Sequence, residues 1–194
     1  MDDGHFSNFR SLDPETADLA HELIDNADRQ RSAFMSFMSL WMGFNGWMES
    51  VTGADHDAAM ITAIAENRRA TDAYEELMQD DDFQRRVMAF SQLWPVLNVR
   101  DVRQKLGRDA FWAQDRDELF DRRRRVGVRM QPVGWTDGDV PTWPQLLRTI
   151  YCVRCNLFHG AKSPQHGRDR DLVRRSGRIL RMFIERGRCF EWTD

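Results

Sequence analysis

The 194-residue sequence has little cysteine, no long hydrophobic run and no familiar catalytic motif. Three cysteines are too few, and odd in number, for the disulfide framework of a small secreted domain. No apolar stretch reaches the roughly 18 residues of a membrane span, because serine, glycine and asparagine interrupt the nearest one, at 33–48. The first residues lack the basic start and apolar run of a signal peptide. We therefore expect a cytoplasmic protein without membrane contact.

Motifs that mark common enzyme classes are missing from the sequence. There is no G-x-S-x-G elbow, no phosphate-cradling G-x-x-x-x-G-K-[ST], no dinucleotide fingerprint and no H-E-x-x-H. The five histidines are scattered, so they do not suggest a metal cluster.

The chain is 41% apolar and 30% charged, which is enough apolar material for a core without disulfides or metal. We expect a single domain over 1–194. The net charge of −3 conceals a division, since 1–82 carry 18 acids against 5 bases and 83–194 carry 13 acids against 23 bases. Two explanations stay open: a polyanionic partner such as nucleic acid, or neutralisation of one half by the other within the fold or across a dimer.

Apolar residues recur at helical spacing along most of the chain. Asp13 and Asp57 are expected to cap two of the helices, and Pro95 is expected to kink or end a third. The second helix is apolar so far round that we expect it buried, as a central strut or in a subunit interface. The predicted helices cover about 14–27, 29–50, 57–79, 82–95, 144–160 and 171–185.

No segment indicates a confident strand, so the predicted class is an all-α helical bundle. A long irregular insertion is expected at about 99–144, before the helix that begins at Pro144. Within it we predict only short helices at 102–106 and 116–124. The run Arg122 to Arg125 is either a solvated face or a polyanion contact.

The stretch from Tyr151 to Gly160 places Arg154, Asn156 and His159 beside the apolar rhythm of its helix. Arg154 and His159 lie about 140° apart around a helix, too wide for a tight pair unless the helix distorts or a second chain supplies the complement. Asn156 and His159 share a face. A histidine with a pKa of about 6.5 suits general acid–base chemistry, and an arginine suits phosphate binding.

Cys152 and Cys155 form a C-x-x-C pattern within this helix. With His159 and Cys189 they would make a zinc site of three cysteines and one histidine. A thioredoxin-like redox pair lacks the alternating strands and helices that accompany it. We favour two small thiols on a helix and expect no metal.

These residues resemble the HEPN superfamily, whose mark is an Arg, four to six residues and a His near the end of one helix of an all-α bundle. Arg154-x4-His159 fits. The string R-C-N-L-F-H-G-A-K at 154–162 is similar to the R-N-x-L-F-H-G-x-K form of a prokaryotic branch that includes abortive-infection proteins, with Cys155 where a first Asn is usual. The segment L-W-M-G-F-N-G-W at 40–47 resembles a W-x-x-F-N stretch of the same branch. The insertion is not covered.

The resemblance implies metal-independent RNA cleavage, without a cofactor, at a composite site where two copies of the helix meet in a homodimer. His159 would act as general acid or base, Arg154 would hold the scissile phosphate, and Asn156 would orient His159 or bind the phosphate. A set of basic residues would hold the RNA strand: Lys162, Arg168, Arg170, Arg174, Arg175 and Arg178.

A defence or toxin role would imply an antitoxin or another defence-system partner. HEPN toxins paired with a nucleotidyltransferase antitoxin commonly carry a Tyr where this chain has Ala161, so neutralisation through that Tyr is not expected. The alternative to a ribonuclease is a non-catalytic HEPN module for nucleic-acid or nucleotide binding or for dimerisation. A zinc-stabilised or DNA-directed protein is a further alternative. Arg154 and His159 alone would also fit a surface Arg and a His favoured by the helix dipole.

Overall fold

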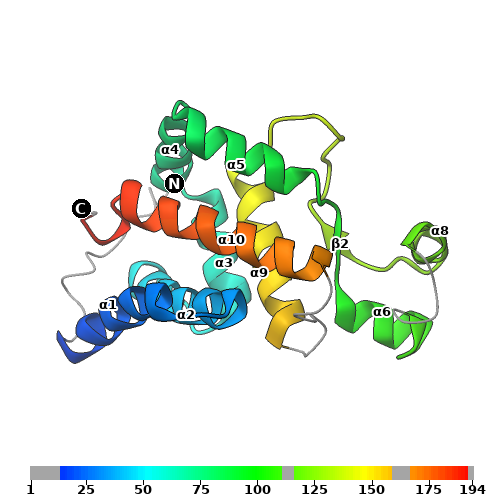
Figure 1. The fold of residues 1–194 in the computed structure, drawn as a ribbon, viewed down its shortest axis with the longest axis horizontal. Helices are drawn as coiled ribbons and strands as arrows, with labels where there is room; N and C mark the ends of the chain where they lie inside the picture. Colours follow the sequence, from blue (N-terminus) through cyan, green and yellow to red (C-terminus); the bar gives the residue numbers. More distant parts are fainter. Residues whose placement is uncertain (1–13, 111–115, 159–166, 192–194) are drawn as a thin grey trace.

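The computed structural model describes residues 14–110, 116–158 and 167–191 (Figure 1). Most of these residues are helical, and the strands form one small antiparallel sheet, so the predicted all-α class is confirmed. The elements are α1 (Pro14–Arg29), α2 (Ala33–Thr52), α3 (Asp57–Glu66), α4 (Arg68–Leu77), α5 (Asp81–Ser91), β1 (Val96–Leu97), α6 (Val99–Leu106), α8 (Arg116–Val126), β2 (Met130–Gln131), α9 (Trp143–Phe158), α10 (Gly167–Arg186) and the 3-10 helix η2 (Cys189–Glu191). Asp13 lies outside the described residues.

Helix α2 is buried in the main core, as its apolar circumference predicts. Trp41, Phe44 and Trp47 are at most 1% exposed. The helix packs against α1, α3, α9 and α10. The Trp47 indole donates a 3.0 Å hydrogen bond to the carbonyl of Cys189 in η2, which ties the end of the described chain to its centre. In the described residues no helix is long and apolar enough to cross a membrane.

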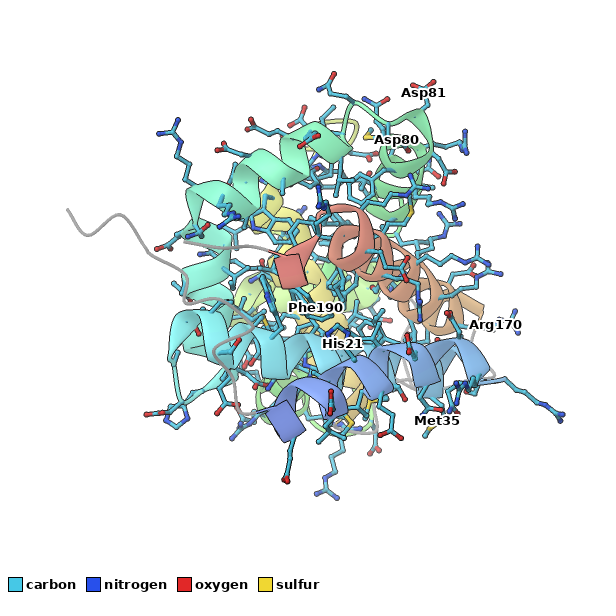
Figure 2. The ribbon with its side chains drawn as sticks, turned by 90° about the vertical axis from the view of Figure 1, so that its left-hand side faces the viewer. His21, Met35, Asp80, Asp81, Arg170 and Phe190 are labelled. Atoms are coloured by element: carbon cyan, nitrogen blue, oxygen red, sulfur yellow. The ribbon has the colours of Figure 1, made fainter. Side chains whose placement is uncertain are left out.

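Helix α1 lies directly against α2 because Gly43 has no side chain. A Cβ at this position would lie 2.7 Å from Cγ1 of Ile24 and 2.8 Å from the carbonyl oxygen of Ala20. In the same part of α1, the His21 ring meets the edge of the Phe190 ring of η2, with ring centres 4.9 Å apart (Figure 2). Close approach at Gly43 therefore sets the position of the α1–α2 hairpin.

The helix predicted over 57–79 is two helices, α3 and α4, separated at Asn67. Asn67 has an extended backbone, and its side-chain oxygen accepts from the amide of Ala70 at 3.1 Å. Asparagine is among the best N-cap residues, since it satisfies an amide that has no partner within the helix. The apolar pattern continues across the break, which explains why periodicity alone predicted one helix. Asp57 is the first residue of α3, and His56 occupies the N-cap position.

The insertion is more ordered than predicted, and the expectation of no strand is wrong there. Val96 and Leu97 of β1 pair with Gln131 and Met130 of β2. Helices α6 and α8 close over a small second core at the right-hand end of Figure 1, away from α1 and α4. This core consists of Leu97, Val102, Ala110, Leu119 and Val128.

A buried carboxylate fastens the insertion to its own sheet. Asp101 of α6 is 3% exposed and accepts hydrogen bonds from the Arg129 guanidinium at 2.6 and 2.7 Å and from the Arg129 amide at 3.1 Å. These bonds favour the charged carboxylate and lower the pKa of Asp101 to about 2. The segment between α6 and β2 is thus anchored next to α9.

Substituting Gly43 by alanine should destabilise the fold by about 1–3 kcal/mol, because the new methyl group meets the backbone of α1 as well as Ile24. Gly46 is the matched control, since it lies in the same helix with nothing within 4 Å of its added Cβ. Alanine there should stabilise by up to about 1 kcal/mol. Urea unfolding of both variants measures the difference, and a Gly43→Ala protein as stable as Gly46→Ala would contradict the packing.

Candidate active site at the end of α9

Arg154, the predicted catalytic cation, lies in the last turns of α9 in a partly closed environment. Its Nη1 forms a 2.8 Å ion pair with Asp57. Its guanidinium lies 4.1 Å from the centre of the Phe158 ring and 5.7 Å from that of Trp41. The side chain is 20% exposed, and its Nε is buried without a hydrogen-bond partner among the described residues. The cation is therefore fixed in orientation but still reaches solvent.

Three helices build this environment. Trp41 comes from α2 and stacks on Tyr151 of α9, with ring centres 5.9 Å apart and planes at 24°. Asp57 comes from the first turn of α3, and Phe158 lies one turn beyond Arg154 on α9. The two segments with a resemblance to HEPN sequences, 40–47 and 154–162, thus meet where Trp41 contacts Arg154.

Asn156, predicted to orient His159 or bind the phosphate, lies buried within this chain, where both of its polar atoms bond to backbone groups. It is 2% exposed. Its oxygen accepts from the amide of Val99 at 3.0 Å, and its nitrogen donates to the carbonyl of Leu97 at 2.8 Å. Both backbone groups lie where β1 leads into α6, so the Asn156 amide joins α9 to the start of the insertion. Its role in the described chain is to position α9.

His159 and Lys162 lie outside the described residues. Their predicted roles, and the convergence of His159 with Arg154, stay predictions.

The arginines of α10 divide between two faces of the helix. Arg168 donates to the carbonyls of Leu93 and Pro95 at 2.6 and 3.2 Å, and Arg175 donates to the carbonyl of Ala89. These carbonyls lie at and beyond the C-terminal end of α5, where backbone oxygens have no partner within the helix. Arg168 and Arg175 therefore stabilise the fold; both are half-buried, and their predicted contact with RNA stays a prediction.

The other predicted arginines of α10 lie on its solvent side. Arg170, Arg174 and Arg178 are exposed and follow one another at four-residue intervals, which places them in a row. Arg174 pairs with Asp171 at 2.8 Å, a surface ion pair of the kind that contributes little. Arg170 projects at the right-hand edge of Figure 2.

The acidic and basic halves of the chain neutralise one another in part. Ion pairs in the described residues join the two halves, and those between residues far apart in the sequence include Arg148–Glu66, Arg154–Asp57, Arg181–Asp28 and Arg186–Asp80, at 2.8–3.2 Å. The second explanation of the charge division, neutralisation within the fold, is thus correct for these residues.

The cysteines are thiols in helical surroundings. Cys152 and Cys189 are buried, and Cys155 is half-buried. Within the part of the chain that the structure describes, no three His, Cys, Asp or Glu side chains come together as metal ligands.

Several site residues have no signal in the sequence. Asp57 reads as a helix cap, and nothing in its surroundings indicates a partner 97 residues away. Tyr151 reads as one more apolar position of α9, yet burial raises the pKa of its hydroxyl well above the usual range, with Cys155 and Asp57 adding to the effect. Tyr151 is therefore a neutral hydroxyl close to the Arg154–Asp57 pair.

No family model, curated protein or solved structure matches this chain.

Replacing Asn156 by alanine should cost about 2–4 kcal/mol of stability, because it leaves a buried amide and a buried carbonyl without partners. Asn26→Ala is the control, since the Asn26 side chain bonds only to Gln30 on the surface of α1 and should change stability by less than about 0.5 kcal/mol. Chemical unfolding measures both. Equal stability of the two variants would show that the Asn156 amide does not hold the insertion.

Proposed function

We propose that the protein is a metal-independent endoribonuclease of HEPN type, in which Arg154 and His159 cleave RNA at a site completed by a second copy of the chain. The observation that carries the proposal is the meeting of the two motif segments. Trp41 and Arg154 are 113 positions apart in the sequence, and the fold brings the indole of one against the guanidinium of the other. Two segments that had only a sequence resemblance in common therefore belong to one site.

The chemistry needs few protein groups because RNA carries its own nucleophile. The 2′-OH loses a proton and attacks the adjacent phosphorus, and the bond to the 5′-oxygen breaks as that oxygen takes up a proton. The products are a 2′,3′-cyclic phosphate and a 5′-hydroxyl. His159 supplies proton transfer near neutral pH, and Arg154 stabilises the charge that grows on the phosphate oxygens.

The surroundings of Arg154 suit this role. A guanidinium presents five N–H donors in a planar fork that matches phosphate oxygens. Asp57 and the rings of Trp41 and Phe158 hold this fork in one orientation before substrate arrives. A charge that is already oriented needs little reorganisation as the transition state forms, which is the basis of electrostatic catalysis.

The RNA strand follows the exposed row of α10 in this proposal. Arg170, Arg174 and Arg178 are available to phosphates, whereas Arg168 and Arg175 serve α5 and Asn156 serves the insertion. Lys162, which comes between the motif and α10 in the sequence, is proposed to add a further cation to this set.

Exposed apolar side chains on α2 and at the end of α9 support a homodimer. Met35 and Met42 are 54% and 51% exposed on α2, seven residues apart and thus on one face. Phe158, which covers the Arg154 guanidinium, is 46% exposed. Exposed large apolar groups around a functional site are typical of a protein interface. The dimer would cover these side chains and bring two Arg154 residues together.

The second candidate is a non-catalytic HEPN module that binds nucleic acid or nucleotides or serves in dimerisation. The ion pair of Arg154 with Asp57 favours it, because a neutralised cation attracts phosphate less strongly. A defence or toxin role, with an antitoxin or other defence-system partner, is compatible with both candidates.

The ribonuclease assay uses purified protein and RNA in EDTA. Wild type should cleave, and the rate should fall by about 10²–10³-fold in Arg154→Ala and 10²–10⁴-fold in His159→Ala. Arg186→Ala, which removes a surface cation paired with Asp80, should cleave as wild type does. Undiminished cleavage by His159→Ala would exclude its role. Cleavage that returns only with added metal would exclude the metal-free mechanism, and RNA binding without cleavage would favour the second candidate.

Light scattering tests the dimer. Wild type at micromolar concentration should show twice the 22.8 kDa mass of one chain. Met42→Glu should give the monomeric mass and lose cleavage, because it places a charge in the proposed interface. Leu19→Glu is the control, since Leu19 is 55% exposed on α1 and its substitution should leave the dimer intact. A stable wild-type monomer that cleaves RNA would exclude the composite site.

A further inference from the structure

A pocket of about 230 Å³ lies beside Arg154, between α3, α9 and the β1–β2 pair. Pockets that enclose drug-sized ligands measure roughly 300–1,000 Å³, so this one fits a flat group of one or two rings. Its apolar wall includes Ile61 of α3, Met130 of β2 and Tyr151 of α9. Sequence motifs did not indicate it, because its walls come from three separate parts of the chain.

The polar groups of the pocket include two side-chain amides and two guanidiniums, in addition to the hydroxyls of Thr62 and Tyr151 and the thiols of α9. Asn98 uses its side-chain oxygen to cap α6, by accepting from the amide of Asp101, which leaves its NH2 group to donate. The Gln131 side chain has no hydrogen-bond partner within the described part of the chain, so it offers a donor and an acceptor together. An amide that can donate and accept at once is the group that reads the edge of a nucleobase.

Two arginines stand at the rim. Arg129 keeps its bonds to Asp101 while 72% of its side chain is exposed, and Arg148 pairs with Glu66 at 3.2 Å. Guanidinium planes and aromatic faces are the surfaces on which unstacked RNA bases stack. Flat cationic groups around a small cavity therefore suit a base that belongs to a phosphate-bearing strand.

The pocket is lined by sequence neighbours of the proposed catalytic groups and by Tyr151, which links it to Trp41. Ala58, which lines it, follows Asp57, and Cys155, which also lines it, follows Arg154. Tyr151 belongs to the pocket wall and stacks on Trp41, the ring that faces the Arg154 guanidinium. A nucleotide whose phosphate contacts Arg154 is thus next to the pocket opening.

We infer that this pocket binds one unstacked base of the RNA strand, adjacent to the phosphate that Arg154 holds, and so sets a base preference at the cleavage position. The inference rests on the proposed function for its position in the strand. Its physical content is a subsite with stacking surfaces and an amide pair from Asn98 and Gln131.

The test uses two neighbouring alanines of α3. Both Ala58 and Ala59 are exposed, but only Ala58 lines the pocket, because successive helical residues point about 100° apart. Ala58→Leu fills the pocket, whereas Ala59→Leu adds the same group elsewhere. Both keep a good helix former, so thermal unfolding should show a folded protein in each case.

Cleavage of a random RNA pool, followed by sequencing of the new ends, gives the base preference. Wild type and Ala59→Leu should prefer one base beside the cut. Ala58→Leu should cleave the preferred sequence about tenfold more slowly or worse, and Gln131→Ala should relax the preference while cleavage continues. If neither variant differs from Ala59→Leu in rate or preference, the pocket inference is wrong and the ribonuclease stands.

Binding is measured in parallel by anisotropy with fluorescent RNA pentamers of a single base, in which 2′-O-methyl groups block the nucleophile and prevent cleavage. Wild type and Ala59→Leu should bind one pentamer at least tenfold more tightly than Ala58→Leu does. This result without cleavage of any RNA by wild type would overturn the ribonuclease and support the base subsite. Equal affinity of all three proteins for every pentamer would overturn the subsite.

Discussion

Burial of the aromatic side of α2 is the constraint on which the rest of the structure depends. Trp41, Phe44 and Trp47 can leave water only if other helices cover α2 on several sides, and α1, α3, α9 and α10 do so. Gly43 permits the closest of these approaches. Because Trp41 is both part of this core and a wall of the Arg154 environment, the main core and the candidate site cannot move independently.

The position of Arg154 follows from the cost of taking a cation out of water. A guanidinium that is only 20% exposed needs compensation, which the Asp57 carboxylate and two ring faces provide. Asp57, Trp41 and Phe158 belong to helices that are held in place by packing in the main core. The Asn156 amide in turn joins α9 to the insertion. The cation is therefore oriented by the fold as a whole. A structural arginine and a catalytic one need the same support, so only a measurement of chemistry separates them.

Helical periodicity predicted the helices that bury one continuous apolar face. It failed where a single capping hydrogen bond, or a partner far away in the sequence, determines the local structure. The break at Asn67 depends on one capping hydrogen bond, and the order of the insertion depends on Asp101 meeting Arg129, 28 residues away. The spacing of Arg154 and His159 pointed to a site. Helical spacing shows which residues share a face of a helix, but it does not show which other element packs against that face. Arg168 is the clear example, since it is half-buried and bonds to backbone carbonyls that follow α5.

The division of the sequence into an acidic and a basic half has a different meaning once the ion pairs between the halves are known. Each base of the C-terminal half that pairs with an acid of the N-terminal half, as Arg181 does with Asp28, no longer attracts a polyanion at full strength. What counts for the proposed contact with RNA is therefore the cation that stays exposed, and in the described residues such cations include the row of Arg170, Arg174 and Arg178, Arg129 beside the pocket, and Arg124 and Arg125 of α8. Arg154 belongs to α9, the helix that also lines the pocket and comes directly before α10 in the chain. A strand that contacted both Arg129 and the α10 row would bridge positions that flank α9 in the sequence, which is the reason to test for cleavage at Arg154.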